Sequence, residues 1–286
     1  MKPAENPFER NEKKYILTAQ QYRDLVIALQ DRLEDDEYPE STVQSLYYDT
    51  PDRLMINRSL SKPAYKEKFR VRAYGPANEK CIVYVELKKK FKGVVYKRRV
   101  PLGLEEASLY VAGMPYEQAA RLSIVRGLVL PEAFSWATLQ TIAEFDACLA
   151  RCEVLEPAMV IVVDRLAKRT VDGSDVRITF DHELRWRDTD LRLGCNLDGA
   201  PLFDEGTVVM EIKCQDAYPL WLARVLSTLH IYPQSCSKVG RAYQMQQEQV
   251  RMEHLPSIAA APRCEHKVLS WQKGMLPHAA AMVACS

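Results

Sequence analysis

The stretch Tyr65-Lys66-Glu67-Lys68-Phe69-Arg70-Val71-Arg72 decides the fold of this chain. Its cations alternate with Phe69 and Val71. Successive side chains of a β-strand point to opposite faces, so the stretch predicts a strand with one cationic and one apolar face. The apolar face can pack on a core. The cationic face must meet water or a polyanion, because buried unpaired charges are costly.

The same alternation occurs in two further stretches, Val83-Tyr84-Val85-Glu86-Leu87-Lys88-Lys89-Lys90 and Val94-Val95-Tyr96-Lys97-Arg98-Arg99-Val100. Turn-forming residues at 75–78 and 92–93 separate the three, which predicts an antiparallel meander. From Lys62 to Arg99 there are thirteen Lys and Arg but only three Glu, although the whole chain carries a formal net charge of +1. The distribution of charge, rather than its total, therefore indicates an anionic partner.

The bulk composition is that of a globular protein, with 286 residues, 47% hydrophobic and 27% charged. We expect a flexible N-terminus over 1–9, one domain over 10–245 and a disordered tail over 246–286. We find no signal sequence and no run of about 20 apolar residues, so we expect no direct membrane insertion. The eight cysteines form no Cys-x-x-Cys pair, which argues against structural zinc and, without a signal, favours the cytoplasm.

Periodicity and turn signals predict the remaining elements. We expect helices over 20–33, 52–60, 105–112, 116–127, 131–149 and 219–230, and strands over 13–17, 42–48, 156–169, 175–187 and 208–213. We expect an acidic loop over 31–40 and irregular chain after about Met245.

The later strands repeat the cationic theme. Arg177 and Asp181 share one face, Glu211 and Lys213 share another, and Arg165 follows an apolar strand. If the sheet curls until it closes, these faces line a tunnel, so we predict an α+β fold: an antiparallel β-barrel tunnel with helices packed outside it. The alternative is a flat sheet with a solvated charged face. One sign of charge dominates, however, and like charges facing each other are destabilising unless an anion offsets them.

Phosphate suits such a face, because Arg offers paired donors to its oxygens and Lys adds point charge. The density of cations predicts a triphosphate or a longer chain. Glu211 and Glu86 are candidate ligands for Mn²⁺ or Mg²⁺, which prefer hard oxygens and can bridge to phosphates. An ion pair with a facing cation is the alternative for Glu211.

The chain resembles the VTC domain, the catalytic domain of the vacuolar transporter chaperone polyphosphate polymerase, within the triphosphate tunnel metalloenzymes. The resemblance covers about residues 8 to 244. It rests on motifs in the family's order: Glu12-Lys13-Lys14-Tyr15, Tyr47-Tyr48-Asp49-Thr50, Lys68-Phe69-Arg70-Val71-Arg72, Glu86-Leu87-Lys88-Lys89-Lys90, Lys97-Arg98-Arg99, Val176-Arg177-Ile178-Thr179-Phe180-Asp181, Glu211-Ile212-Lys213 and Ser237-Lys238. Two positions differ from common family residues: Val163 replaces a Tyr and Ser235 replaces a Lys.

The resemblance implies a tunnel that binds a nucleoside triphosphate and moves its γ-phosphoryl group onto polyphosphate. By motif match, the phosphate contacts would be Lys14, Arg70, Arg72, Lys88, Lys97, Arg165 and Arg177. Glu211 would hold the metal, and Ser237 and Lys238 would close the site. We take Arg70, Arg72, Lys88, Lys97, Arg165 and Arg177 as the catalytic set. The strand pattern adds Lys68, Arg99 and Lys213 as phosphate ligands and Glu86 as a second metal ligand.

The expected partners are ATP and inorganic polyphosphate or pyrophosphate, with a membrane partner, if any, on a separate protein. A triphosphate hydrolase of the same fold and a non-catalytic polyphosphate-binding module are the alternatives. RNA binding would require exposed aromatic residues among the cations. The aromatic residues present are Tyr65, Phe69, Tyr74, Tyr84, Phe91 and Tyr96; most fit core-face or strand-end positions, so we expect no nucleic acid.

Overall fold

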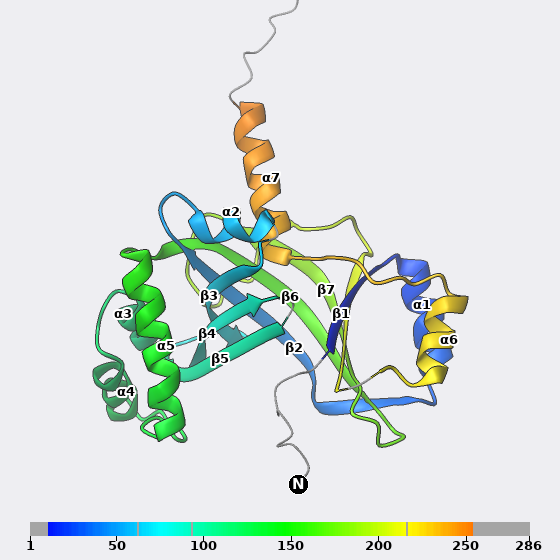
Figure 1. Ribbon diagram of the computed structural model, residues 1–286, viewed down its shortest axis with the longest axis horizontal. Helices are drawn as coiled ribbons and strands as arrows, with labels where there is room; N and C mark the ends of the chain where they lie inside the picture. Colours follow the sequence, from blue (N-terminus) through cyan, green and yellow to red (C-terminus); the bar gives the residue numbers. More distant parts are fainter. Residues whose placement is uncertain (1–10, 62, 93, 216, 254–286) are drawn as a thin grey trace, which may run out of the picture.

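The computed structural model describes residues 11–61, 63–92, 94–215 and 217–253 (Figure 1). The strands are β1 (Asn11–Leu17), β2 (Leu33–Asp49), β3 (Tyr65–Tyr74), β4 (Ile82–Phe91), β5 (Val94–Gly103), β6 (Glu156–Thr170), β7 (Arg177–Arg187), β8 (Ala200–Pro201) and β9 (Val208–Cys214). The helices are α1 (Ala19–Leu29), α2 (Leu54–Leu60), α3 (Leu104–Val111), α4 (Tyr116–Val125), α5 (Trp136–Cys152), α6 (Leu220–Thr228) and α7 (Lys238–Glu253).

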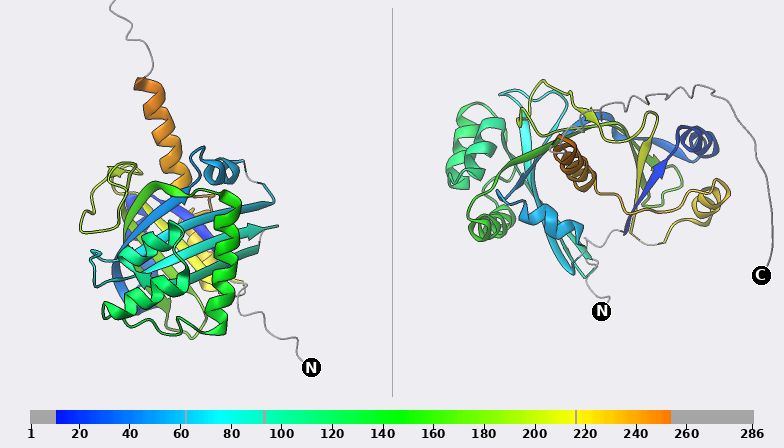
Figure 2. Two further views of the ribbon diagram at one scale, coloured as in Figure 1. Left: turned by 90° about the vertical axis from the view of Figure 1, so that its left-hand side faces the viewer. Right: turned by 90° about the horizontal axis from the view of Figure 1, so that it is seen from above.

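All strands belong to one antiparallel sheet, in the order β1-β9-β7-β6-β2-β3-β4-β5, with β8 paired to β7. The long central strands β2 and β6 pair along most of their length. The sheet is strongly curled, so that β3, β4 and β5 lie on one side of the molecule and β1 and β9 on the other (Figure 2). The predicted meander of three cationic strands is confirmed, because β3 pairs β4 and β4 pairs β5.

Helices cover the outer face of the curled sheet on both sides, as predicted. On one side α3, α4 and α5 pack against β3, β4 and β5, where Phe69, Val85 and Leu87 are fully buried. On the other side α1 and α6 pack against β1, β7 and β9, around Tyr15 and Met210. The apolar residues of each alternating strand therefore face outward into these cores, and the cations of the same strands face inward.

The inner face is not uniformly charged. Val43 of β2 and Ile161 and Val163 of β6 form an apolar strip along the middle of the sheet, and they cluster with Val239 and Ala242 of α7. Seen from above, α7 stands between the two sides of the sheet (Figure 2). The cationic positions are thus confined to two walls, which are separated by an apolar strip.

The sheet curls into the predicted antiparallel tunnel, although hydrogen bonds between strands do not close it. Among the described residues, β1 is hydrogen-bonded to one neighbouring strand, β9, and β5 is hydrogen-bonded to one neighbouring strand, β4. The segment between α6 and α7 covers part of the free edge of β1, because the Gln234 amide donates to the Lys14 carbonyl at 2.8 Å. A crossing segment thus satisfies backbone groups that a closing strand would otherwise pair.

Two boundaries also differ from the sequence prediction. Residues 33–40 begin β2 instead of forming a loop, since Asp35 and Glu34 pair with Lys168 and Arg169 of β6 at 2.6 and 3.0 Å. Residues 246–253 are helical because α7 runs to Glu253; this stretch contains good helix formers and no Gly or Pro. The rest of the predicted tail and residues 1–9 lie outside the described residues. No helix of the described part is long and apolar enough to cross a bilayer.

Candidate functional site

The inner face encloses a cavity of about 870 Å³. Among the described residues, its lining contains twelve cations: Lys13, Lys14, Lys66, Lys68, Arg70, Arg72, Lys88, Lys90, Lys97, Arg165, Lys213 and Lys238. Only two carboxylates, Glu12 and Glu211, line it with them. These residues come from β1, β3, β4, β5, β6, β9 and the start of α7. All of these cations except Lys13 point inward to a shared space, and a flat sheet with one solvated face is excluded. Lys13 shares the outward face of β1 with Tyr15, and its ammonium lies 5.1 Å from the ring centre of Tyr218.

The structure brings most of the sequence-predicted site residues to this cavity. They are Lys14, Lys68, Arg70, Arg72, Lys88, Lys97, Arg165, Glu211, Lys213, Ser237 and Lys238. Three predicted residues are not part of the lining: Glu86, Arg99 and Arg177. Arg99 is exposed, and its guanidinium lies 4.9 Å from the ring centre of Tyr84. Arg177 forms an ion pair with Asp36 at the start of β2. Neither Arg is carried into the phosphate-binding set proposed below.

Glu86 faces inward from β4 but is buried at the centre of a cationic cluster, so it does not line the cavity. Its Oε2 is 2.6 Å from Arg70 Nη2, and its Oε1 is 2.7 Å from Lys97 Nζ. Arg72 Nε lies 3.9 Å from the same carboxylate. Burial by itself would raise the pKa of Glu86, but Arg70, Arg72 and Lys97 together hold this pKa well below its usual range. Glu86 is therefore ionised and engaged through both oxygens.

Tyr47 holds the other side of Arg70. The Arg70 Nη1 donates to the Tyr47 hydroxyl at 2.9 Å, and the guanidinium lies 5.6 Å from the Tyr47 ring centre. Burial opposes ionisation of the phenol, but Arg70, Lys68 and Arg72 lower the pKa of Tyr47 to about 7. The guanidinium is thus fixed between a carboxylate and a phenol, with its orientation set before any ligand arrives.

A second cluster is built on the opposite wall around Glu211 of β9. Glu211 Oε1 lies 3.2 Å from Lys14 Nζ and 3.0 Å from Lys238 Nζ. Lys238 also contacts Asp181 at 2.6 Å, and Arg165 donates two hydrogen bonds to the same Asp181. Despite burial, these cations hold the pKa of Glu211 well below its usual range. The first residue of α7 is thereby fastened to β7 and β9.

The two walls also meet across the open seam. Lys88 of β4 lies 3.4 Å from Glu12 of β1, although no backbone pairing joins their sides of the sheet. Lys68 of β3 donates to the Ser237 hydroxyl at 2.8 Å, just before α7. Side-chain contacts, instead of ladder hydrogen bonds, therefore close the ring of residues around the cavity.

The carboxylates differ in their fit to a divalent metal. Glu86 does not fit, because three cations surround it and it is 1% exposed; its predicted role as a metal ligand is replaced by that of an ion-pair partner. Glu211 fits better, since it lines the cavity and the contact of its Oε2 with Lys213 Nζ is long, at 4.0 Å. The described residues contain no cluster of three or more His, Cys, Asp or Glu suited to a metal. A metal here would thus rely on phosphate oxygens for most of its ligands.

Two cavity lysines lie in surroundings that disfavour their charge. Burial, as the largest cause, lowers the pKa of Lys68 to about 8 and also lowers that of Lys97 to about 8, although Glu86 partly opposes this at Lys97. A bound polyanion would favour the charged forms of both. The cavity therefore carries its full positive charge only when an anion occupies it or when the pH is below about 8.

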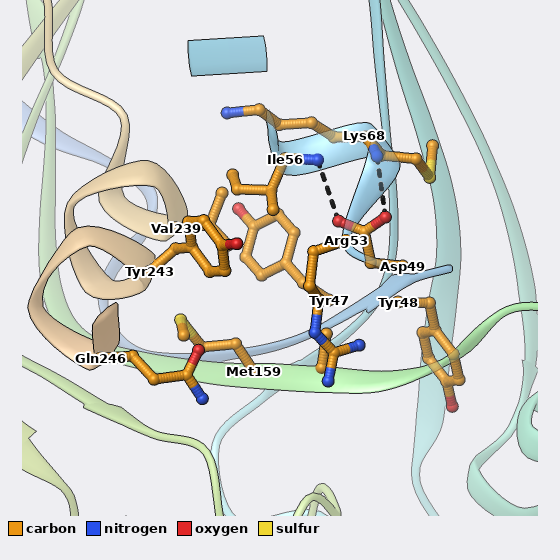
Figure 3. Close-up of a pocket in the computed structure, with 12 residues that line it drawn as sticks. Tyr47, Tyr48, Asp49, Arg53, Ile56, Lys68, Met159, Val239, Tyr243 and Gln246 are labelled. Carbon is orange, nitrogen blue, oxygen red and sulfur yellow. Dashed lines mark hydrogen bonds between the residues drawn. The ribbon is translucent and has the colours of Figure 1, made fainter. Parts of the chain in front are cut away.

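A small pocket of about 30 Å³ adjoins the cavity where α7 begins (Figure 3). Tyr47, Lys68 and Val239 border both spaces, and Tyr243 of α7 lines the small one. The next residues of β2 are structural: the Asp49 carboxylate accepts hydrogen bonds from the Met55 and Ile56 amides, which caps α2 (Figure 3). The three residues of the Tyr47-Tyr48-Asp49 motif thus have different positions. Tyr47 lines the cavity, Tyr48 packs in the outer core, and Asp49 caps α2.

The sequence did not single out four residues that the structure places at this site: Lys66, Lys90, Tyr47 and Asp181. Lys66 and Lys90 continue the inward-facing series of β3 and β4, so the alternation already contained their signal. Asp181 shares a strand face with Arg177, but the sequence gives no role for its carboxylate. The sequence did not show which of the adjacent residues Tyr47 and Tyr48 faces the cavity, because both have the same side chain. In the structure, Tyr48 faces the core.

Several solved structures are similar to this chain. Among solved structures, a Bacillus halodurans protein proposed to be an adenylate cyclase aligns at 12% identity, covering 80% of this chain and 94% of that one, with a TM-score of 0.47. The Hippeastrum protein HpAC1, reported to have a dominant triphosphatase activity, aligns at 14% identity, covering 81% and 93%, with a TM-score of 0.43. The PH1819 protein of Pyrococcus horikoshii aligns at 13% identity, covering 83% and 99%, with a TM-score of 0.41.

These TM-scores are all below 0.5, so none of the three likenesses bears on the chemistry of this chain. No curated protein matches it. The family description "VTC domain", in contrast, matches residues 9–246, which is most of the sequence and includes both walls of the cavity. The motif order, the cation-lined cavity and this match together show that the chain belongs to the VTC domain family.

Proposed function

We propose that this protein is a polyphosphate polymerase that transfers the γ-phosphoryl group of ATP to the end of an inorganic polyphosphate chain. The observation that carries the proposal is the excess of inward-facing cations over carboxylates in one cavity, eleven against two among the described lining residues. A single monophosphate could not offset so much like charge, whereas a triphosphate donor and an anionic acceptor bound together could. The cavity volume is that of sites which enclose whole ligands.

The chemistry proposed requires no covalent nucleophile. A terminal oxygen of the acceptor attacks the γ-phosphorus, the bond from that phosphorus to the β–γ bridging oxygen breaks, and ADP leaves as the chain gains one phosphate. The attacking oxygen is already ionised near pH 7, so no general base is needed. Phosphoryl transfer then depends on in-line positioning and on neutralising charge at the transferring group.

Residues of both walls would take part in positioning the phosphates and neutralising their charge. Arg70, Arg72 and Lys97 would contact the phosphates from one wall, where Glu86 fixes their positions. Arg165 and Lys238 would do so from the other wall, where Asp181 holds both. Glu211 would hold a divalent cation, which, when bound, would neutralise charge on the phosphates.

Incubation with ATP and Mn²⁺, followed by electrophoresis of the products, tests this proposal. We expect long polyphosphate together with ADP. Free phosphate without long chains would instead identify a triphosphate hydrolase that uses water as the acceptor. Tight polyphosphate binding in calorimetry with no ATP turnover would identify a non-catalytic binding module. Each of the two outcomes contradicts the polymerase.

A further inference from the structure

The inward-facing positions of β3, β4 and β5 do not remain cationic to the end of the strands. On β3 the inward series runs Lys66, Lys68, Arg70, Arg72 and then Tyr74. On β4 the inward series has Tyr84 before Glu86, and Tyr84 lies directly opposite Arg72 in the register. Two neighbouring inward positions thus carry aromatic rings where the rest of the wall carries charge.

The two rings form one unit beside Arg72, a residue of the cavity lining. The Tyr74 and Tyr84 ring centres are 6.0 Å apart and the ring planes meet at 78°, which is an edge-to-face pair. The Arg99 guanidinium lies over the Tyr84 ring at 4.9 Å. Tyr74 is 44% exposed, so much of its surface is open to a ligand. We call Tyr74, Tyr84 and Arg99 the aromatic rim.

The aromatic rim adjoins the phosphate-binding cations instead of standing apart from them. Tyr74 lies opposite Val43 of β2, while Arg72 lies opposite Ser45 and Arg165 opposite Ser41. Along β2, the position opposite Tyr74 therefore lies between the positions opposite Arg72 and Arg165, which both line the cavity. Along β3 the step from Arg72 to Tyr74 is two residues, about 7 Å, which is the order of distance that a ribose places between a base and its α-phosphate.

We propose that the aromatic rim is the nucleobase subsite: the base of the donor nucleotide stacks on Tyr74, supported edge-on by Tyr84, while the triphosphate enters the cationic cavity. This inference rests on the proposed use of a nucleoside triphosphate. Stacking on aromatic rings is tolerant of base identity, because every base presents a π-face. The subsite should accordingly accept different nucleoside triphosphates without reading the edges of their bases.

Calorimetry with two probes, ATP and inorganic tripolyphosphate, tests the inference without requiring turnover. Both titrations are made without divalent metal. Tyr74→Ala should weaken ATP binding about tenfold, the effect expected for one lost stacking contact. It should leave tripolyphosphate binding unchanged, because that ligand has no base. Tyr74→Phe, which keeps the ring, should bind ATP as the unaltered protein does.

Tyr96→Ala is the matched control, because Tyr96 is an exposed tyrosine of β5 that alternates with the cavity-lining Lys97 and therefore faces the opposite side of the sheet. It should change neither affinity. If Tyr74→Ala does not fold, Tyr74→Leu keeps the apolar bulk but removes the π-face and should show the same selective loss. An equal loss of affinity for ATP and for tripolyphosphate would show that the aromatic rim has only a structural role. No loss of affinity for either ligand would show that the aromatic rim does not bind the nucleotide. Both results overturn the inference.

The experiment also separates this inference from the proposed function. Failure to make polyphosphate in the product assay would refute the polymerase but would leave the two affinities, and thus the subsite, measurable. Conversely, if the protein makes polyphosphate but Tyr74→Ala does not weaken ATP binding, the proposed activity stands and the proposed subsite is refuted. A preference for one base of more than about a hundredfold would also contradict stacking as the means of recognition.

Discussion

Glu86 on β4 and Arg70 on β3 face each other across the sheet, with Glu86 Oε2 2.7 Å from Arg70 Nε and 2.6 Å from Nη2. Both donors contact one carboxylate oxygen, and such charge-assisted contacts are stronger than those between neutral groups. The carboxylate thereby holds in place a guanidinium that we propose binds phosphate. Lys97 and Arg72 lie close to the same carboxylate, so one buried anion offsets the repulsion of three cations.

Glu86→Gln should destabilise the fold by about 3–5 kcal/mol, because buried cations lose their compensating charge. Saturating tripolyphosphate should restore much of the loss, since the ligand supplies negative charge to the same cluster. Thermal unfolding with and without tripolyphosphate measures both effects. Glu144→Gln is the control: Glu144 pairs with Lys89 and Arg98 on the outer face, and its loss should cost about 1 kcal/mol or less. Equal melting temperatures for the two variants would contradict this role of Glu86.

Lys97→Ala and Arg72→Ala should each lower polyphosphate synthesis by a factor of about 100 or more, the usual effect of removing one charge-stabilising donor. The fold should survive, because removing one of several mutually repelling cations leaves Glu86 paired with the others. Initial rates with ATP and Mn²⁺, together with circular dichroism, provide the measurement. Loss of folded structure in both variants would contradict the assignment of these cations to a solvated cavity wall.

Glu211→Gln should raise the Mn²⁺ concentration required for half-maximal activity about tenfold or more, because the amide is a poorer ligand for a hard cation. A titration of activity against Mn²⁺ measures this change. Glu12→Gln is the matched control, since Glu12 is the other carboxylate of the cavity lining. A metal requirement that is unchanged in Glu211→Gln would leave Glu211 as an ion-pair partner of Lys14 and Lys238 only.

Binding of tripolyphosphate should weaken as the pH rises through about 8. The pKa of Lys68 and that of Lys97 are both about 8, below the usual value for lysine, because burial disfavours the ammonium form. Above this pH the empty cavity loses charge, and ligand binding must then take up protons. Calorimetry at pH 9 in buffers of different ionisation enthalpy should show this uptake. The side chain introduced by Lys97→Arg stays charged at pH 9, so this variant should reduce both the proton uptake and the loss of affinity. An unchanged proton uptake would contradict the lowered pKa of Lys97.

Much of the fold was predictable from local patterns. Period-two alternation assigned Phe69 and Val71 to the core and Arg70 and Arg72 to the opposite face, and the structure confirms both assignments. Turn residues fixed the meander of β3, β4 and β5, and the change to helical periodicity after residue 104 correctly predicted the outer helices. These features depend on neighbours in the chain, so the sequence contains them.

The site was predictable only in part, because alternation assigns a face but not the partner across it. The inward position of Glu86 followed from its strand, yet its enclosure by Arg70, Arg72 and Lys97 depends on the register of three strands. Arg177 has the parity of an inward residue, but the curl of the sheet carries it to Asp36, away from the cavity lining. Sequence alone could not distinguish these two outcomes.

The sequence by itself therefore determined which side chains face inward and that their charge is mostly positive. The tertiary structure decided that the sheet curls without closing, that the segment before α7 crosses the seam, and that Lys238 ties α7 to Asp181 and Glu211. The reason is physical: side-chain direction follows from backbone geometry within a strand, whereas contacts between distant strands follow from the twist and stagger of the whole sheet.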